Sequence, residues 1–344
     1  MMKARPKAPV AQKLLDQFGN PVRRKRAWDG QDKDAFFRDK YAHVHAKQAL
    51  NRHPKNSTAT KPDPSKAPLP SKDFASKFKS IVEKDPSSEY LFGKSVVSAV
   101  LDTRKVLKVF CGQRLADCDP EIVQACDAKG VALQANTPLQ HLEIMSNFSV
   151  HNKYIAQVKR KEYSEFSNVQ VSPFSISVGG ESFPLLNKMP LGVYIDQVTD
   201  THNLGAIIRC AYWLGADFVA FSARNCAPMS PQVIKSSAAS AEYLPIFTVS
   251  SPLKLMEELK QTWNLIGTFP KSEHSLTNVE PNQLASLREQ PCLLVIGSED
   301  KGIRTSIVQR CTHSTTLSAA RDTKAVDSLN VSVATALLLE KLKI

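Results

Sequence analysis

The sequence lacks several features that would place it in other classes of protein. No run of roughly 18 or more residues is continuously apolar, so we expect no membrane-spanning helix. The seven cysteines are an odd number and never occur as Cys-x-x-Cys, which argues against a disulfide framework or a structural zinc site. We expect these thiols to be small buried hydrophobic groups in a reducing compartment.

Signatures of several enzyme classes are missing as well. The chain has no Gly-x-Gly-x-x-Gly motif, no P-loop and no Gly-x-Ser-x-Gly elbow, which disfavours dinucleotide binding and α/β-hydrolase chemistry. Its eight histidines show no His-Glu-x-x-His or comparable spacing, so we expect no metal cofactor.

The net positive charge of the chain lies entirely at its N-terminal end. Residues 1–79 contain 19 lysines and arginines against 7 acidic residues, whereas residues 80–344 contain 26 of each sign. Such a surplus can hold a polyanion such as RNA, serve as a targeting segment, or belong to a solvated tail. The basic, acid-poor start permits mitochondrial import, and the cluster Arg23–Arg26 keeps a nuclear or nucleolar destination open.

The chain is predicted to consist of a basic extension and two α/β domains. Residues 1–87 form the extension, and its proline-rich part has too few apolar side chains to fold. Residues 88–163 alternate short strands and helices, which predicts a small α/β domain. Residues 164–188 are interpreted as a linker, and residues 189–344 as a second α/β domain.

The second domain is expected to contain parallel strands that are buried on both faces. Continuous apolar runs predict strands at Leu191–Ile195, Asp217–Phe221, Leu265–Thr268 and Cys292–Ile296. Helices are predicted between them, including one from Gly205 to Leu214. Ligands bind at the carboxyl ends of such strands, so the polar residues that follow the strands are candidates for a site.

The first polar segment, Asp196 to Arg209, follows a strand and runs into a helix. Asn203 and Gly205 suit a tight turn at the start of the helix, and Arg209 could hold a phosphate through two hydrogen bonds. An arginine that only reaches solvent or pairs with Asp200 is the alternative interpretation.

Two further polar segments lie near the C-terminus. In the second, Gly297 ends an apolar run and Glu299 lies in a glycine-bounded loop, where the backbone can approach a ligand closely. An ordinary strand-to-helix turn would have a similar sequence. In the third, Ser328 or Asn330 can cap an apolar C-terminal helix, which by itself requires no function.

Taken together, the three segments resemble the signature motifs of the SpoU/TrmH branch of the SPOUT RNA methyltransferases. The family pattern is Asn-x-Gly-x-x-x-Arg, then an apolar strand ending in Gly-x-Glu-x-x-Gly, then Ser-Leu-Asn-Val-Ser. All three motifs occur in this order, and the resemblance covers about residues 89–344. The segment Tyr90–Gly93 resembles the start of the family's accessory RNA-binding domain. The segment Ser222–Ser237 is most similar to mitochondrial large-subunit rRNA guanosine 2′-O-methyltransferases and their bacterial 23S relatives.

The resemblance implies a fold, an activity and partners. The implied fold is α/β, a parallel-sheet SPOUT domain with a C-terminal trefoil knot, preceded by a small α/β RNA-binding domain and the basic N-terminal extension. The implied activity is S-adenosylmethionine-dependent methylation of a ribose 2′-hydroxyl, on a guanosine of mitochondrial large-subunit rRNA. The implied partners are rRNA or a pre-ribosomal particle and a second copy of the chain in a homodimer, in the mitochondrion.

The resemblance also implies roles for individual residues. By position, Arg209 matches the catalytic arginine, Asn203 the residue that supports its loop, and Glu299 the acid of the second motif. Two polar residues of the third motif match a pair near the reacting centre, and three residues match backbone contacts to the cofactor: Ser328 and Asn330, and Gly297, Leu317 and Leu329.

Two segments depart from the family pattern. Leu317–Ala319 stands where relatives carry Ile-Pro-Met, and Ala238–Ser240 stands where they carry Ala-Gly-Ala. If the glycine position requires a positive φ, Ala239 would cost stability there. These departures leave open a non-catalytic SPOUT-fold protein that binds RNA or assists ribosome assembly. A tRNA 2′-O-methyltransferase would keep the chemistry and change the substrate.

Overall fold

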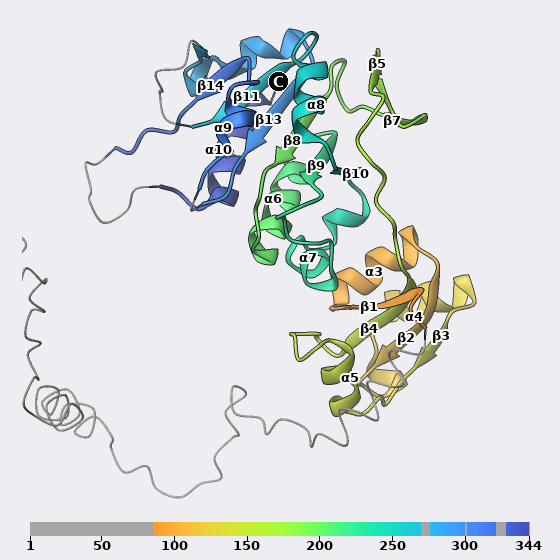
Figure 1. Cartoon of the computed structure of the whole chain (residues 1–344). Coiled ribbons are helices and arrows are strands. Elements are labelled where there is room, and N and C mark those ends of the chain that lie inside the picture. Colours follow the sequence, from red (N-terminus) through yellow and green to blue (C-terminus); the bar gives the residue numbers. More distant parts are fainter. Residues whose placement is uncertain (1–84, 270–275, 300, 321–327, 344) are drawn as a thin grey trace, which may run out of the picture. The chain divides into compact units, whose positions relative to one another are not determined.

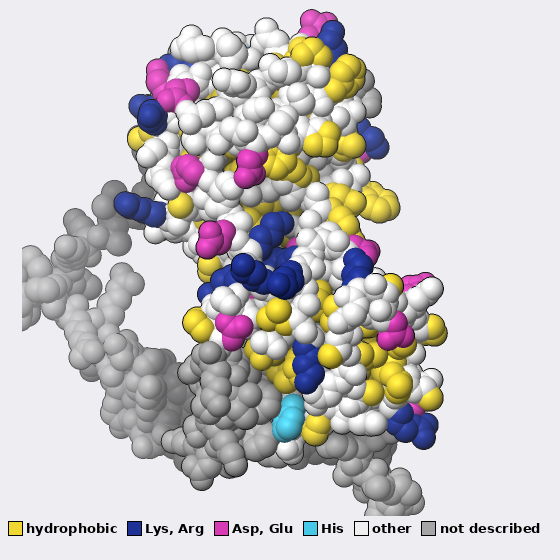
Figure 2. All heavy atoms as spheres, turned by 90° about the vertical axis from the view of Figure 1, so that its right-hand side faces the viewer, with side chains coloured by type: hydrophobic (Ala, Val, Ile, Leu, Met, Phe, Trp, Pro, Cys, Tyr) yellow, Lys and Arg dark blue, Asp and Glu magenta, His cyan; other side chains and the backbone are white. Residues whose placement is uncertain are grey.

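The computed structural model describes residues 85–269, 276–299, 301–320 and 328–343, which form three β-sheets with helices packed on them (Figure 1). All of these residues belong to one compact unit, Leu69–Ile344. Residues 1–84, which carry the basic surplus, lie outside the described residues. On the face drawn in Figure 2, lysine and arginine side chains gather near the middle.

A four-stranded sheet comes first in the chain. Its order is β1-β4-β2-β3, with β4 antiparallel to β1 and β2, and β3 parallel to β2. The sequence predicts helices at Ser95–Leu101 and Glu121–Lys129 and strands at Val106–Phe110 and Val131–Leu133, which are present as α3, α4, β2 and β3, but it does not predict β1, β4 or α5. The elements are β1 (Ser88–Phe92), α3 (Lys94–Thr103), β2 (Val106–Cys111), α4 (Pro120–Lys129), β3 (Ala132–Gln134), α5 (Leu139–Met145) and β4 (Tyr154–Lys159).

Residues 164–188, interpreted above as a linker, contain a sheet of their own. Strands β5 (Gln170–Ser172), β6 (Ser175–Val178) and β7 (Glu181–Pro184) pair as an antiparallel meander. Gly179 and Gly180 join β6 to β7 with φ values of 60° and 94°. A two-residue Gly-Gly connection between alternating segments is a signal for a hairpin, because type I′ turns need positive φ at both positions. That signal was available in the sequence.

The third sheet has seven strands in the order β10-β9-β8-β13-β11-β14-β12. Every neighbouring pair is parallel, so all carboxyl ends lie at one edge. The four strands predicted from apolar runs are present as β8, β9, β11 and β13. The seven are β8 (Leu191–Ile195), β9 (Phe218–Ser222), β10 (Ile246–Val249), β11 (Asn264–Thr268), β12 (Thr277–Asn278), β13 (Cys292–Ile296) and β14 (His313–Thr315).

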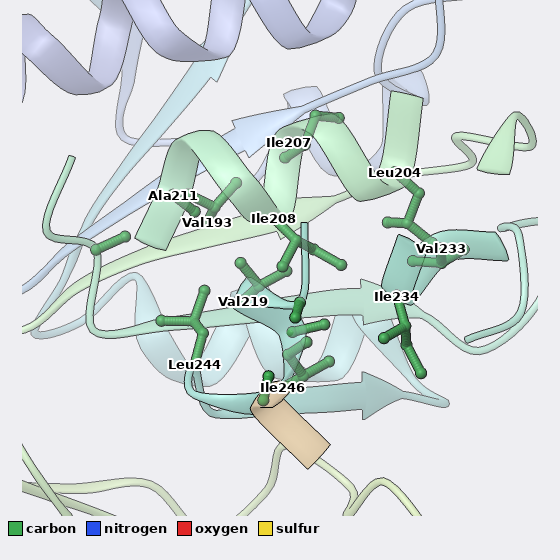
Figure 3. Packing of buried hydrophobic residues seen from close by; sticks show 14 of the residues in the cluster. Val193, Leu204, Ile207, Ile208, Ala211, Val219, Val233, Ile234, Leu244 and Ile246 are labelled. Atoms are coloured by element: carbon green, nitrogen blue, oxygen red, sulfur yellow. The ribbon is translucent and has the colours of Figure 1, made fainter. Parts of the chain in front are cut away.

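Helices cover both faces of this sheet, and two of them meet beside the candidate site. The helices are α6 (Thr201–Trp213), α7 (Pro231–Ser236), α8 (Pro252–Leu259), α9 (Thr305–Val308) and α10 (Val331–Leu342), with short 3₁₀ turns η3 (Ser240–Glu242) and η4 (Pro281–Glu289). Figure 3 shows Ile208 and Ala211 of α6 near Val193 and Val219 of the strands, and Leu204 of α6 beside Val233 of α7; all of them are fully buried. Removal of this apolar surface from water holds α6 in place.

Helix α6 begins earlier than the sequence predicts. Asp200 caps it by accepting a 2.7 Å hydrogen bond from Asn203 N, so Asn203 and Gly205 lie in the first turns of the helix and not in a tight turn. Gly205 is needed for packing instead. A Cβ there would lie 2.0 Å from Ser236 Oγ and 2.7 Å from Val233 O of α7, so only glycine lets the two helices approach this closely.

The end of α7 departs from the usual choice of residue. Ala238 N donates to Lys235 O and Ala239 N donates to Ile234 O, which is the hydrogen-bond pattern of a Schellman cap. Ala238 and Ala239 have φ values of 51° and 68°, in the left-handed region that favours glycine. The positive φ that would make Ala239 costly is therefore present, and Ala238 has a positive φ as well.

A buried ion-pair cluster joins the first sheet to the third. Arg104, at the end of α3, donates two 2.7 Å hydrogen bonds to the carboxylate of Glu242 and one of 2.6 Å to Glu89. The side chains of Arg104 and Glu242 are 5% and 0% exposed. Hydrogen bonding to Glu242 raises the pKa of Arg104 against the opposing effect of burial, so the guanidinium stays charged.

Candidate functional site

A cavity of about 260 Å³ lies at the carboxyl edge of the seven-stranded sheet. It is formed where β11, β13 and β14 end and where α10 begins, which is the position at which parallel sheets bind ligands. All three residues proposed to contact the cofactor line it: Gly297, Leu317 and Leu329. Glu299 and Ser328 line it as well.

Gly297 allows the backbone to fold tightly at the end of β13. A Cβ at Gly297 would lie 2.1 Å from Gly302 C and 2.2 Å from Ile303 N, so no other residue fits. Ser298 and Gly302 exchange two backbone hydrogen bonds of 3.2 and 2.8 Å, and Gly302 has a φ of 64°. This small hairpin places Glu299 at its tip, beside the cavity.

Glu299 joins the three polar segments through its carboxylate. Oε2 accepts a 3.0 Å hydrogen bond from Asn203 Nδ2, and Oε1 accepts one of 2.6 Å from Asn330 Nδ2 and one of 3.1 Å from Val331 N. Asn330 Nδ2 also donates to Asn203 Oδ1 at 3.0 Å. The structure thus brings together three of the five residues predicted to be catalytic. Hydrogen bonds to a charged carboxylate are the stronger kind, so this network fixes the amides of Asn203 and Asn330.

Asn330 has a second role as the cap of α10. Its Oδ1 accepts hydrogen bonds from Ser332 N at 3.0 Å and Ser332 Oγ at 2.6 Å, as the sequence predicts for one of the two candidate caps. The amide therefore presents its oxygen to the helix and its nitrogen to Glu299. Ser328 lies two residues earlier, is exposed and lines the cavity.

Arg209 lies on α6 but outside this network. It follows Asn203 by six residues, which corresponds to about 9 Å along a helix axis and a rotation of about 120°. Its side chain is exposed, and its guanidinium makes no hydrogen bond or ion pair with the residues that the structure describes. The alternative pairing with Asp200 is not found, because Asp200 caps α6. The guanidinium is therefore available to an anion.

Sequence reasoning missed one ion pair at this site. Asp196, at the end of β8, is fully buried and accepts hydrogen bonds from Arg304 Nη2 at 2.6 Å, Arg304 Nε at 3.0 Å and Arg304 N at 3.1 Å. The hydrogen bond with Asp196 raises the pKa of Arg304. The pair fastens the loop that carries Glu299 to the end of β8, an inner strand of the sheet. An acid directly after an apolar strand is a signal for Asp196, because a buried acid is rarely left unpaired, but nothing in the sequence points to Arg304 as its partner.

The cavity suits a ligand with both polar and apolar parts. Thr315 is fully buried, lines the cavity, and its hydroxyl has no hydrogen-bond partner among the described residues. Such a group is expected to pair with a ligand, because an unpaired buried hydroxyl costs stability. The apolar part of the cavity wall is formed by Phe269, Leu317 and Leu338. These residues fit a nucleoside cofactor such as S-adenosylmethionine, with glycine backbone groups close to it.

Two other kinds of site receive no support from the described part of the chain. Within residues 85–343, where described, no group of three or more histidine, cysteine, aspartate or glutamate side chains is arranged to hold a metal ion. In the same residues no helix is long and apolar enough to cross a membrane.

The fold and site define an α/β methyltransferase of the SPOUT type. A similar solved structure is the SpoU methyltransferase AviRb from Streptomyces viridochromogenes in complex with AdoMet, with a TM-score of 0.58 at 19% identity, covering 78% of this chain and 96% of that one. The model of the SpoU rRNA Methylase family matches residues 190–340, and the model of the MRM1 N-terminal domain matches residues 9–81.

Curated relatives agree with these matches. Mitochondrial rRNA methyltransferase 1 of Saccharomyces cerevisiae is 31% identical, over 93% of this chain and 88% of its own length. The 23S rRNA (guanosine-2′-O-)-methyltransferase RlmB of Pectobacterium atrosepticum is 28% identical, over 73% of this chain and 96% of its own length. The chain belongs to the SpoU rRNA methylase family. The likeness also reaches into the basic extension, which the sequence motifs left outside the resemblance.

Proposed function

We propose that this protein transfers a methyl group from S-adenosylmethionine to the ribose 2′-hydroxyl of a guanosine in mitochondrial large-subunit rRNA. The observation that carries the proposal is the network of Asn203, Glu299 and Asn330 at the mouth of the cofactor-sized cavity. The named activities of the yeast and bacterial relatives supply the substrate.

The cofactor brings an activated methyl group on a sulfonium to the site. Gly297, Leu317 and Leu329 would hold it in the cavity, and the hydroxyl of Thr315 would pair with one of its polar groups. Asn203 and Asn330, held by Glu299, line the approach of the ribose. Because these three side chains are fixed to one another before substrate arrives, orientation of the ribose costs little further entropy.

Arg209 is proposed to hold the phosphate beside the target ribose and to stabilise the negative charge that develops on the attacking oxygen. A guanidinium is effectively never deprotonated in proteins, so it is unsuited to act as a general base. It does present two parallel N–H groups to a phosphate. Its exposure and the lack of a partner among the described residues support this role.

A homodimer is also proposed, with α6 and α10 in its interface. These two helices pack against each other, and each leaves large apolar side chains in water. Trp213 and Tyr212 are 82% and 45% exposed, and Val333 and Leu337 are 47% and 46% exposed. Large exposed apolar side chains on two adjacent helices favour an interaction site there. We further propose that the C-terminal region of residues 189–344 contains the trefoil knot of this family.

The four-stranded module within residues 88–163 is proposed to bind the RNA substrate, and residues 1–87 to carry a mitochondrial targeting segment. The mitochondrial name of the yeast relative supports this location. Imaging a fluorescent protein fused to residues 1–60 tests it. Accumulation in mitochondria is expected, and a diffuse or nuclear signal would refute the targeting role.

The proposed activity is tested by transfer of a labelled methyl group from S-adenosylmethionine to mitochondrial large-subunit rRNA, with a tRNA pool as a second substrate. We expect label on one ribose of the rRNA. Arg209→Ala should abolish transfer and leave the affinity for S-adenosylmethionine unchanged, while Arg209→Lys should retain a part of the activity because it keeps the charge. Label on tRNA alone would change the substrate class. Folded protein that binds RNA without transfer to either substrate would indicate an assembly factor.

A further inference from the structure

A second cavity, of about 500 Å³, opens at the same edge of the sheet as the cofactor cavity. Phe221 and Ala223, at the end of β9, and Thr248, in β10, form its base. Because β8 to β14 are all parallel, these residues face the same side as Gly297 at the end of β13. Two strand spacings separate β9 from β13, which is about 10 Å.

The walls of this second cavity combine apolar groups with an aromatic ring. Met229 and Pro231 come from the loop and first turn between β9 and α7, and Tyr163 comes from the segment that follows β4. That segment is held to the sheet: Thr248 N donates to Ser164 O at 2.9 Å, and Phe166 N donates to Thr248 O at 2.8 Å. Tyr163 is thus fixed to the same sheet as the rest of the cavity.

The cavity is lined by two cations that have no ion-pair partner among the described residues, and by one carboxylate, Glu89. Lys161 and Arg160 line it, and neither side chain forms an ion pair with a described residue. The ammonium of Lys161 lies 5.6 Å from the centre of the Tyr163 ring. The nearby carboxylates of Glu89 and Glu242 are engaged by Arg104. Burial lowers the pKa of Lys161, and the attraction of Glu242 opposes this effect without cancelling it.

We infer that this cavity binds one unpaired nucleotide of the RNA substrate that flanks the methylated ribose, with its base against Met229, Pro231 and Tyr163 and its phosphate on Lys161 and Arg160. This inference rests on the proposed function. An aromatic ring beside cations is how proteins hold single-stranded RNA, since the ring stacks on a base and the cations pair with the backbone. The volume lies within the range of small-ligand sites.

The bound nucleotide would contribute to the choice of methylation site. The cofactor cavity and the Asn203–Glu299–Asn330 network act on a ribose, which is the same in every nucleotide of RNA. A neighbouring base held in a shaped cavity supplies discrimination that the ribose cannot. Strand β9 of the second cavity lies about 10 Å along the sheet edge from β13 of the cofactor cavity, which nucleotides next to the target can span.

The test uses the full-length protein and a fragment of mitochondrial large-subunit rRNA that contains the methylated guanosine. Abasic nucleotides replace each of the three positions on either side of the target in turn. Both kcat/KM for methyl transfer and Kd by fluorescence anisotropy are measured. With wild-type protein, one flanking position should be distinguished by a loss of about tenfold or more in both quantities.

Lys161→Met should weaken binding of the intact fragment about tenfold and should remove most of the effect of the abasic substitution at that one position. Lys260→Met is the matched control, because Lys260 is also half-buried but lies at the end of α8, away from the cavity. It should behave as wild type. Thermal unfolding checks that both variants fold.

The outcomes separate this inference from the proposed function. Methyl transfer that is equally tolerant of abasic substitution at all six positions would overturn the flanking-nucleotide cavity and leave the enzyme intact. An abasic effect that persists unchanged in Lys161→Met would overturn the assignment to this cavity. Absence of transfer to any RNA would refute the proposed function, and the anisotropy series would still decide whether the cavity selects a nucleotide.

Discussion

The two left-handed alanines after α7 allow a stability prediction of unusual sign. Ala238→Gly should stabilise the protein, although alanine-to-glycine changes normally destabilise. Ala238 is exposed and has a φ of 51°, where the Cβ costs about 1–2 kcal/mol. Glycine removes that cost but makes the unfolded chain more flexible, which lowers the gain in stability by about 0.4–1 kcal/mol. The net gain is about 0.5–1 kcal/mol, which corresponds to a rise in Tm of about 1–4 °C.

Ala239→Gly should have almost no effect. Ala239 has the same kind of φ, at 68°, but it is only 2% exposed. Removing its buried methyl group costs about 0.8 kcal/mol, which cancels the relief of backbone strain. The backbone terms are alike at the two adjacent alanines, and the burial of the Ala239 methyl group makes the predicted outcomes differ.

The assay is urea and thermal unfolding of both variants beside Ala206→Gly. Ala206 lies within α6 with ordinary helical geometry, so the same chemical change should destabilise by about 1 kcal/mol there. Equal destabilisation of all three variants would refute the reasoning, because it would mean that the left-handed backbone after α7 carries no strain.

Three further predictions concern other contacts. Glu299→Gln should lower kcat/KM for methyl transfer about 10–100-fold, since one charge-assisted hydrogen bond to Asn203 is lost, and a change below twofold would contradict this. Arg104→Met should destabilise by about 3–5 kcal/mol because it leaves buried Glu242 unpaired, whereas the double variant with Glu242→Leu should recover most of that loss; purely additive effects in urea unfolding would contradict the pairing. Burial raises the pKa of Cys311 from 9.0 to about 12, so the native thiol stays protonated while the unfolded one ionises, and stability should fall by about 1.4 kcal/mol per pH unit from pH 9 towards pH 12. Cys311→Ala should lack this component, and an unchanged difference between the two proteins across that range would contradict it.

Three of the four strands that the sequence predicts in the third sheet share one property. Each of β8, β9 and β13 is buried at every position, so its sequence is a continuous apolar run. Strands β12 and β14 have two and three residues, too few for any periodicity to be recognised. They exist because neighbouring strands of the sheet offer them backbone hydrogen bonds, which is a tertiary effect.

The site shows a similar division between local and distant information. The resemblance of three motifs to those of the family indicates Asn203, Glu299 and Asn330, and the structure places them in hydrogen-bond contact. The pair between Asp196 and Arg304 joins residues 108 positions apart, and no local pattern indicates it. Gly205 was assigned to a turn because glycine is common there, whereas its actual constraint comes from α7, a helix that sequence reasoning did not predict.

The strand order also has a consequence for synthesis of the protein. Strand β8 lies between β9 and β13, yet about a hundred residues separate the end of β8 from the start of β13. At a translation rate of about 5–20 residues per second, β13 leaves the ribosome roughly 5–20 seconds after β8. During that interval one edge of a wholly apolar strand has no hydrogen-bonding neighbour, and such edges promote aggregation. The nascent chain is therefore a natural client for chaperones, and its yield in cell-free synthesis should depend on them.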